Sequence, residues 1–186
     1  MVRGKPSNKN PFWQSGCAIR SLTKAMMISS RTSDSYDQQS KRQPSPYERS
    51  LQKLVIEENL EGLIEVDSAG TGDWHIGKSP DSRSCQTALN HGIDISSLRA
   101  RLFEDRDFAH FDYILAMDKK NLKDISIMKP QDYSGNLDLF LSFASNPSLT
   151  EVPDPYYSGS DGFELVIDLI SDASKGLLKH IQQHVL

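Results

Sequence analysis

Residues 46–186 alternate between segments with the apolar spacing of a helix and short segments with the character of strands, which limits the folds open to the chain. Strands separated by helices favour a parallel sheet with helices on its faces, because each helix carries the chain back to start the next strand in the same direction. In such sheets ligands bind beyond the carboxyl ends of the strands. The predicted helices are 46–59, 80–92 and a long amphipathic terminal helix at 162–186. The predicted strands are 63–68 and 111–117, and residues 137–143 should form a further strand or a mixed segment.

Local signals mark where several of these elements begin and end. The sequence S-P-Y-E at residues 45–48 reads as a capping box with proline at the first helical position, so a helix should begin there. Gly92 is a candidate C-cap for the second helix, and Asp118 should begin a short helix. Residues 101–108 should hold a short strand or a turn, and the very apolar segment 111–117 should be buried on both faces.

Charge divides the chain near residue 45. Residues 1–45 carry eight Lys or Arg, two Asp and nine Ser, with a net charge of +6, whereas the remainder carries a net charge of −10. The first segment also lacks the apolar periodicity that a packed domain needs. We therefore predict two regions, a basic, Ser-rich and disordered leader at 1–45 and a globular α/β body at 46–186.

The composition sets further bounds on the class of protein. A chain of 186 residues, 37% hydrophobic and 25% charged, suits one globular domain, and no apolar run reaches the roughly 18 residues of a membrane span. Cys17 and Cys85 form no C-x-x-C pair, which fits a reducing compartment without disulfides. His180 and His184 have the spacing of a metal pair but no third ligand nearby. We expect neither a membrane nor a nucleic acid as partner, and the family resemblance described below also implies no metal and no cofactor.

The stretch VPDPYY at residues 152–157 places one carboxylate between two prolines and before two tyrosines. Proline fixes φ and restricts the residue before it, so Pro153 and Pro155 should hold this loop nearly rigid. One interpretation is that Asp154 is a positioned general acid beside aromatic walls. The alternative is an ordinary rigid turn whose tyrosines pack on the body.

Several separated segments resemble one known family. VDSAGTGDWHIG, FDYILAMDKKNL, VPDPYYSG and GFELVIDLISDASKGLL together look like the low-molecular-weight protein-tyrosine phosphatases, over roughly residues 45–186 and in that family's order. The resemblance implies a doubly wound α/β fold with a parallel four-stranded sheet flanked by helices. It also implies a reaction in which a cysteine thiolate attacks the phosphate of phosphotyrosine or of a small aryl phosphate, and water then hydrolyses the phosphocysteine.

The resemblance assigns roles to several residues of the body. Asp154 corresponds to the general acid, and Ser68 corresponds to a serine that supports the phosphate-binding loop. Trp74, Tyr156 and Tyr157 correspond to residues that wall the aromatic cleft, although a lone Trp also commonly caps the edge of a core. Asp118 matches the family's aspartate after the buried strand, whereas Cys85 reads as a small buried hydrophobe within a helix.

The family's phosphate-binding loop, C-x5-R-S/T between the first strand and the first helix, is missing from this sequence. An ungapped alignment places the nucleophile position at Gln38 and the arginine position at Pro44, and no C-x5-R occurs anywhere in the chain. The segment SGCAIRS at 15–21 resembles only the second half of the loop and lies about 25 residues too early. Residues 29–38 also lack the apolar strand expected before the loop, so we expect an irregular leader to replace the first strand and the loop. Leu98 is a second departure, because it stands where the family commonly carries a histidine that braces the loop.

These observations leave three interpretations of function open. In the first interpretation, the chain is an inactive member of the family as it stands, and the working phosphatase has an alternative N-terminus that supplies the loop. It could instead be a non-catalytic module that presents the aromatic cleft to phosphotyrosine proteins. Family resemblance implies a cytoplasmic monomer, while the composition of residues 1–45 also resembles an organellar transit segment.

Overall fold

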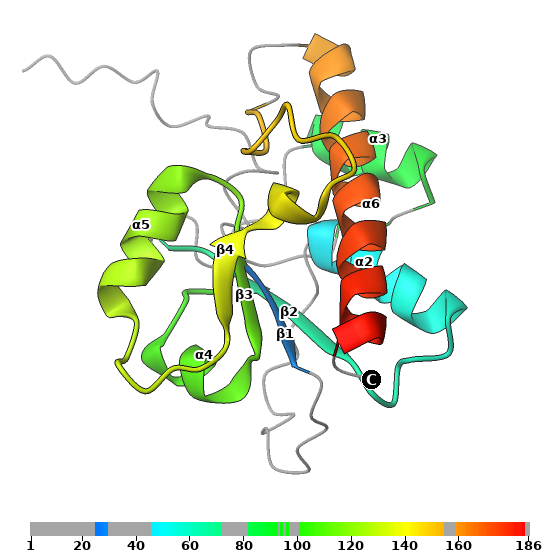
Figure 1. Ribbon diagram of the computed structural model, residues 1–186. Helices are drawn as coiled ribbons and strands as arrows, with labels where there is room; N and C mark the ends of the chain where they lie inside the picture. Colours follow the sequence, from blue (N-terminus) through cyan, green and yellow to red (C-terminus); the bar gives the residue numbers. More distant parts are fainter. Residues whose placement is uncertain are drawn as a thin grey trace, which may run out of the picture.

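A four-stranded sheet in the order β2-β1-β3-β4 forms the centre of the molecule in the computed structural model (Figure 1). The structure describes residues 25–29, 46–71, 82–92, 94, 96, 101–154 and 159–184. The strands are β1 (Ala25–Ser29), β2 (Glu65–Ala69), β3 (Tyr113–Ala116) and β4 (Asn136–Leu139). The helices are α2 (Pro46–Glu57), α3 (Ser82–Asn90), α4 (Asp105–His110), α5 (Lys119–Met128), the 3₁₀ helix η3 (Phe140–Phe143) and α6 (Gly159–His184).

The strand β1 comes from the segment that composition assigned to the leader, and it corrects two expectations. Residues 25–29 are not irregular; they form a central strand that pairs with β2 on one side and β3 on the other. Both pairings are antiparallel, whereas β3 and β4 are parallel, so the sheet is mixed and not fully parallel. The physical reason is that AMMIS is short, wholly apolar up to its final serine and flanked by polar sequence, so only burial in the sheet satisfies it.

Each strand of the sheet centre contributes side chains to two cores. On one face, Met26 and Ile28 of β1 pack with residues of α2 and α6. On the other face, Ala25 and Met27 pack with aromatic residues around α4 and with Ile125 of α5. This alternation follows from the two-residue period of a strand, and it confirms that the segment around β3 is buried on both faces. The α/β class, with helices flanking a four-stranded sheet, is confirmed.

The helices lie on both sides of the sheet, as Figure 1 shows for α2 and α6 on one side and α5 on the other. Three predicted helices were found, α2, α3 and α6, and Gly92 adopts the positive φ of 74° that favours glycine after a helix. Two helices differ from expectation. The helix expected from Asp118 through Leu122 continues to Met128 as α5, and the short helix α4 begins within the segment 101–108, after a single bridge between Gly70 and Leu102.

Candidate functional site

Asp118 lies where β3 ends, at the carboxyl edge of the sheet. It is the N-cap of α5, and its carboxylate accepts a hydrogen bond of 2.7 Å from the backbone N–H of Asn121. The sequence D-K-K-N places this pair at the N-cap and third helical positions, where such a bond satisfies an otherwise unpaired N–H group. Asp118 is only 4% exposed, so its side chain is buried at this edge of the sheet.

The loop that carries Asp154, which begins at Val152 and is called the acid loop below, is attached to the same edge by backbone contacts. The N–H of Val152 donates to the carbonyl oxygen of Met117 at 2.9 Å, which fixes the loop directly beside the end of β3. The carboxylate of Glu151 accepts from the backbone N–H of Lys119 at 2.9 Å, and the Lys119 ammonium lies 3.3 Å away. The hydrogen bond from that N–H, followed by the lysine side chain, lowers the pKa of Glu151. Asp154 follows two residues after the anchored Val152 and is partly exposed.

A buried amide joins the loop after β2 to α5. Asn121 is 1% exposed, and its side-chain oxygen accepts from the Thr71 hydroxyl at 3.0 Å. Its side-chain nitrogen is buried and has no hydrogen-bond partner among the described residues. Sequence analysis did not single out Thr71 or Asn121. The helix-start spacing after Asp118 was the signal that could have pointed to Asn121.

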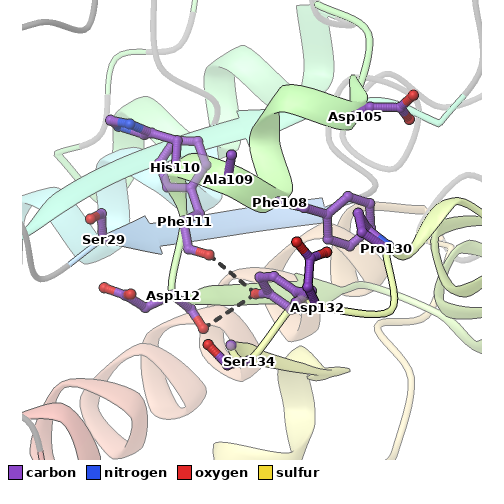
Figure 2. A pocket seen from close by; sticks show the side chains of 12 residues that line it. Ser29, Asp105, Phe108, Ala109, His110, Phe111, Asp112, Pro130, Asp132 and Ser134 are labelled. Atoms are coloured by element: carbon purple, nitrogen blue, oxygen red, sulfur yellow. Dashed lines mark hydrogen bonds between the residues drawn. The ribbon is translucent and has the colours of Figure 1, made fainter.

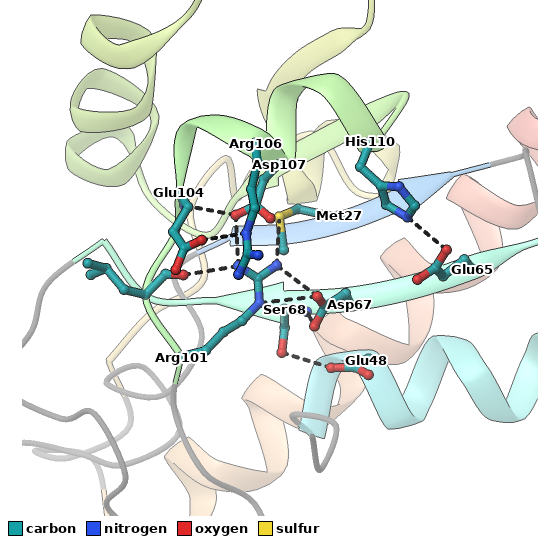
Figure 3. A network of polar contacts seen from close by, with 11 residues as sticks. Met27, Glu48, Glu65, Asp67, Ser68, Arg101, Glu104, Arg106, Asp107 and His110 are labelled. Carbon is teal, nitrogen blue, oxygen red and sulfur yellow. Dashed lines mark hydrogen bonds and ion pairs between the residues drawn. The ribbon is translucent and has the colours of Figure 1, made fainter. Parts of the chain in front are cut away.

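Ser68 lies near the end of β2 and connects the sheet to the first described helix. Its hydroxyl donates to the side chain of Glu48 at 2.9 Å, and Glu48 is 7% exposed in the first turn of α2 (Figure 3). The structure therefore places Ser68 next to the amino-terminal turn of α2, where anions bind most readily to backbone N–H groups. The expected role of Ser68 in supporting a phosphate-binding loop remains a prediction.

Arg101 forms the most connected polar cluster behind this edge (Figure 3). Its guanidinium lies 2.7 Å from Asp67 of β2 and 2.7 Å from Asp107 of α4, and it also donates to the Leu102 carbonyl oxygen at 3.0 Å. Burial alone would lower the pKa of Arg101, but the hydrogen bond to Asp107 and the charge of Asp67 outweigh burial and raise it. This cluster holds β2 and α4 together, and sequence analysis did not identify it.

Several predicted site residues lie outside the described part of the chain. Trp74, Tyr156, Tyr157 and Leu98 fall there, as does Ser45 of the expected capping box. Among the predicted residues that are described, the carboxyl edge brings together Ser68, Asp118 and Asp154.

Cys85 and the two terminal histidines have structural surroundings. Cys85 packs against Ala88 and Ile167, as expected for a small apolar side chain between α3 and α6. The rings of His180 and His184 stack at 4.3 Å, and the His184 ring lies 2.9 Å from the His180 carbonyl oxygen. The described residues include no group of three potential metal ligands. None of the described helices combines the length and apolar character needed to cross a bilayer.

The direction of β1 decides where its flanking segments join the sheet. Ala25 pairs with Ala69 and Ala116, the last residues of β2 and β3, so β1 begins at the carboxyl edge. Ser29 pairs with Glu65, the first residue of β2, so β1 ends at the amino edge. The two edges are roughly 13 Å apart, the length of four strand residues. The chain after β1 therefore starts on the side of the sheet opposite Asp118 and the acid loop.

The fold and the anchored acid loop define a doubly wound α/β domain of the kind that binds ligands at the carboxyl edge of its sheet. The family model described as low molecular weight phosphotyrosine protein phosphatase matches residues 42–186, and the chain belongs to this family. A phosphatase of that name from Schizosaccharomyces pombe is 44% identical over 140 residues, which cover 74% of this chain and 88% of the relative. The matched region begins within the segment that aligns with the missing loop, after the nucleophile position at Gln38.

Solved structures agree with this assignment. The crystal structure of YfkJ from Bacillus subtilis is 35% identical, with a TM-score of 0.69, and the match covers 76% of this chain and 89% of that one. A protein tyrosine phosphatase from Entamoeba histolytica, crystallised with Hepes in its active site, is 33% identical with a TM-score of 0.70. That match covers 76% of this chain and 90% of the amoebal chain.

Proposed function

We propose that this protein is a member of the phosphotyrosine phosphatase family that binds phosphotyrosine proteins at the carboxyl edge but does not hydrolyse them at a phosphatase rate. The family membership and the names of the relatives support the ligand class. The acid Asp154 and the supporting residue Ser68 are retained, and Trp74, Tyr156 and Tyr157 would wall the cleft. The nucleophilic cysteine and the loop arginine of C-x5-R are absent from the sequence.

The observation that carries this proposal is the antiparallel direction of β1. In the family, the loop that holds the phosphate joins the first strand to the first helix. Here the strand in the central position ends with Ser29 at the amino edge, so the segment after it leaves the sheet away from Asp118 and Val152. A phosphate cradle cannot follow directly from this strand at the acid's edge. Loss of the nucleophile alone costs roughly 10⁶ in kcat in a cooperating catalytic set.

The test is a measurement of p-nitrophenyl phosphate hydrolysis by the full chain, with Asp154→Asn, Cys17→Ser and Cys85→Ser as variants. We expect no turnover above the buffer rate in any of the four folded proteins. Turnover that falls with Asp154→Asn and with one cysteine variant would contradict the proposal and identify the nucleophile. Cys17 is the more informative variant, because the chain before Ala25 joins β1 at the acid's own edge.

Binding is tested separately by calorimetric titration with phosphotyrosine peptides and with the same peptides unphosphorylated. Heat with the phosphorylated peptide alone, reduced in Trp74→Ala, which removes one proposed wall of the cleft, would support the binding module. Equal or absent heat with both peptides would refute it. In that case a working phosphatase would require an alternative N-terminus, which full-length transcript sequencing would detect as a C-x5-R encoded before Ser45.

We further propose that the protein is a cytoplasmic monomer whose domain comprises residues 46–186 together with the strand β1. The absence of a C-x-x-C pair supports a reducing compartment. A reporter fused to residues 1–45 should stay cytosolic; import into an organelle would show that this segment is a transit sequence. Light scattering on the purified chain should return the mass of one copy, and a mass of two copies would contradict the monomer.

A further inference from the structure

A cavity of about 520 Å³ lies at the amino edge of the sheet, on the side opposite the acid loop (Figure 2). It is bounded by α4, by the turn before β3, by the end of β1 and by the loop that leads into β4. Its size is within the range of small-molecule sites. Because strand β3 separates it from Asp118, the cavity is distinct from the candidate functional site.

The aromatic wall of this cavity is held in a fixed arrangement. The Tyr133 hydroxyl lies 3.2 Å and 3.3 Å from the carbonyl oxygens of Phe111 and Asp112 and donates to this pair, as Figure 2 shows. The rings of Phe108 and Tyr133 pack edge to face with centroids 5.1 Å apart. Gly135 permits this arrangement, since a Cβ at that position would overlap the Tyr133 ring. The apolar surface therefore exists before any ligand arrives.

The described charged residues that line the cavity are mostly acidic. Asp105, Asp112 and Asp132 all line it, and no Lys or Arg is among its described lining residues. His110 also lines the cavity, and its ring lies 2.9 Å from the Glu65 carboxylate. Burial, followed by the charge of Asp112, raises the pKa of Tyr133, so the negative potential reaches the aromatic wall.

The aromatic wall already has a cation beside it. The Lys129 ammonium lies over the Tyr133 ring, 5.5 Å from its centroid. A cation at that distance is attracted by the negative face of the ring, and the attraction strengthens when carboxylates lie nearby. Lys129 approaches from outside the lining, so the cavity itself offers an aromatic wall and carboxylates to a second cation.

We propose that the amino-edge cavity binds an organic cation, an ammonium or guanidinium group carried on an apolar body. The apolar body would lie against Phe108 and Tyr133, and the cation would lie beside Asp132. Such a group occurs in free aryl and alkyl amines and in the Lys and Arg side chains of proteins. The inference is independent of the proposed phosphotyrosine site, because neither Asp154 nor Ser68 contributes to this cavity.

The test is a titration of the full chain, followed by the amide resonances of Phe108, Tyr133 and Gly135, at low salt and neutral pH. The probes are 2-phenylethylamine for a free amine, Nα-acetyl-arginine methylamide for a protein side chain, and 3-phenylpropionate as an anion of similar shape. We expect both cations to shift these resonances and the anion to leave them unchanged. The tighter of the two cations indicates the natural source, and either order supports the proposal.

Two variants test whether binding depends on a carboxylate within the cavity or only on the overall negative charge of the protein. Asp132→Asn removes one lining carboxylate and should weaken cation binding about five-fold, the effect of one charge at close range in water. Asp168→Asn removes an exposed carboxylate on α6, outside the cavity, and should leave the affinity unchanged. Both variants should unfold at the temperature of the unmodified chain. Equal binding of the anion, no shifts with either cation, or equal effects of the two variants would each overturn the proposal.

Discussion

Arg101 illustrates how much a single side chain can hold in this domain. It is 15% exposed and joins a carboxylate of β2, 12% exposed, to a fully buried carboxylate of α4. A buried ion pair contributes little more to folding stability than well-packed apolar side chains would. Removing one partner, however, leaves the other charge buried without compensation and is destabilising. The sequence around it, R-A-R-L-F, gave no sign of these contacts. Asp67 is distant in the chain, and Asp107 lies in the helix α4, which was not predicted.

We expect Arg101→Met to lower the free energy of unfolding by about 3–5 kcal/mol, because Asp67 and Asp107 would stay buried without a cation. Urea denaturation of the full chain measures this. Arg106→Met is the matched control: Arg106 is 62% exposed and pairs with Glu104 at the surface, so its loss should cost less than about 1 kcal/mol. Equal losses in the two variants would show that the Arg101 cluster does not hold β2 to α4.

Tyr133 should make stability depend on pH in the alkaline range. Burial and the Asp112 charge raise its pKa above the ordinary value of about 10, so the folded state keeps a proton that the unfolded state releases. The contribution of Tyr133 is therefore complete below pH 10 and is lost as the pH rises towards the folded pKa. Above pH 10 the unmodified chain should lose up to about 1.4 kcal/mol per pH unit more than Tyr133→Phe. Identical slopes in urea denaturation above pH 10 would contradict this account.

At the scale of elements, sequence patterns predicted most of the body. The helices α2, α3 and α6 and the strands β2, β3 and β4 all lie within or beside their predicted ranges, because each has a clear apolar period or a recognisable cap. The helix α4 was missed because six residues are too few to show a helical period. Of the site, the positions of Asp118 and Asp154 followed from the resemblance, whereas the Asn121 and Arg101 contacts depend on tertiary packing.

The close contact between α6 and η3 depends on one glycine. A Cβ at Gly176 would overlap the carbonyl oxygen of Phe143, which is backbone and cannot turn aside. We expect Gly176→Ala to destabilise the protein by about 1–3 kcal/mol, although alanine favours a helix, because the two elements would have to separate. Gly62→Ala, where no atom lies within 4 Å of the added Cβ, should be close to neutral. Thermal unfolding of both variants provides the measurement, and a stabilised Gly176→Ala would refute the close approach.

At the scale of the whole molecule, the basic leader and the acidic body are not separate, because β1 supplies the centre of the sheet. Composition could not predict this, since the four apolar residues of β1 hardly change the average of a segment of 45. Nor could the direction of β1 be predicted, because side chains alternate between faces in the same way for either direction of a strand. Two adjacent methionines, Met26 and Met27, are flexible enough to fill the two cores from this position.

Ile28→Ala tests whether β1 is part of the folded molecule in solution. Ile28 is fully buried in the core beneath α2 and α6, so its truncation should lower the free energy of unfolding by about 2–4 kcal/mol. Ile127→Ala, at a side chain that is 76% exposed, should change it by less than about 0.5 kcal/mol. If both variants unfold at the same urea concentration, residues 25–29 do not occupy the sheet.

The central position of β1 also affects the order of events during synthesis. This strand leaves the ribosome first, yet one neighbour, β3, begins about 85 residues after Ile28. At roughly 5–20 residues per second, the apolar segment waits about 4–17 s for that partner. During this interval β1 can pair only with β2, and its second edge stays unpaired until β3 has been synthesised. The nascent chain therefore carries an incompletely paired apolar strand while about 85 of its 186 residues are synthesised, which exposes the strand to chaperones that bind short extended segments.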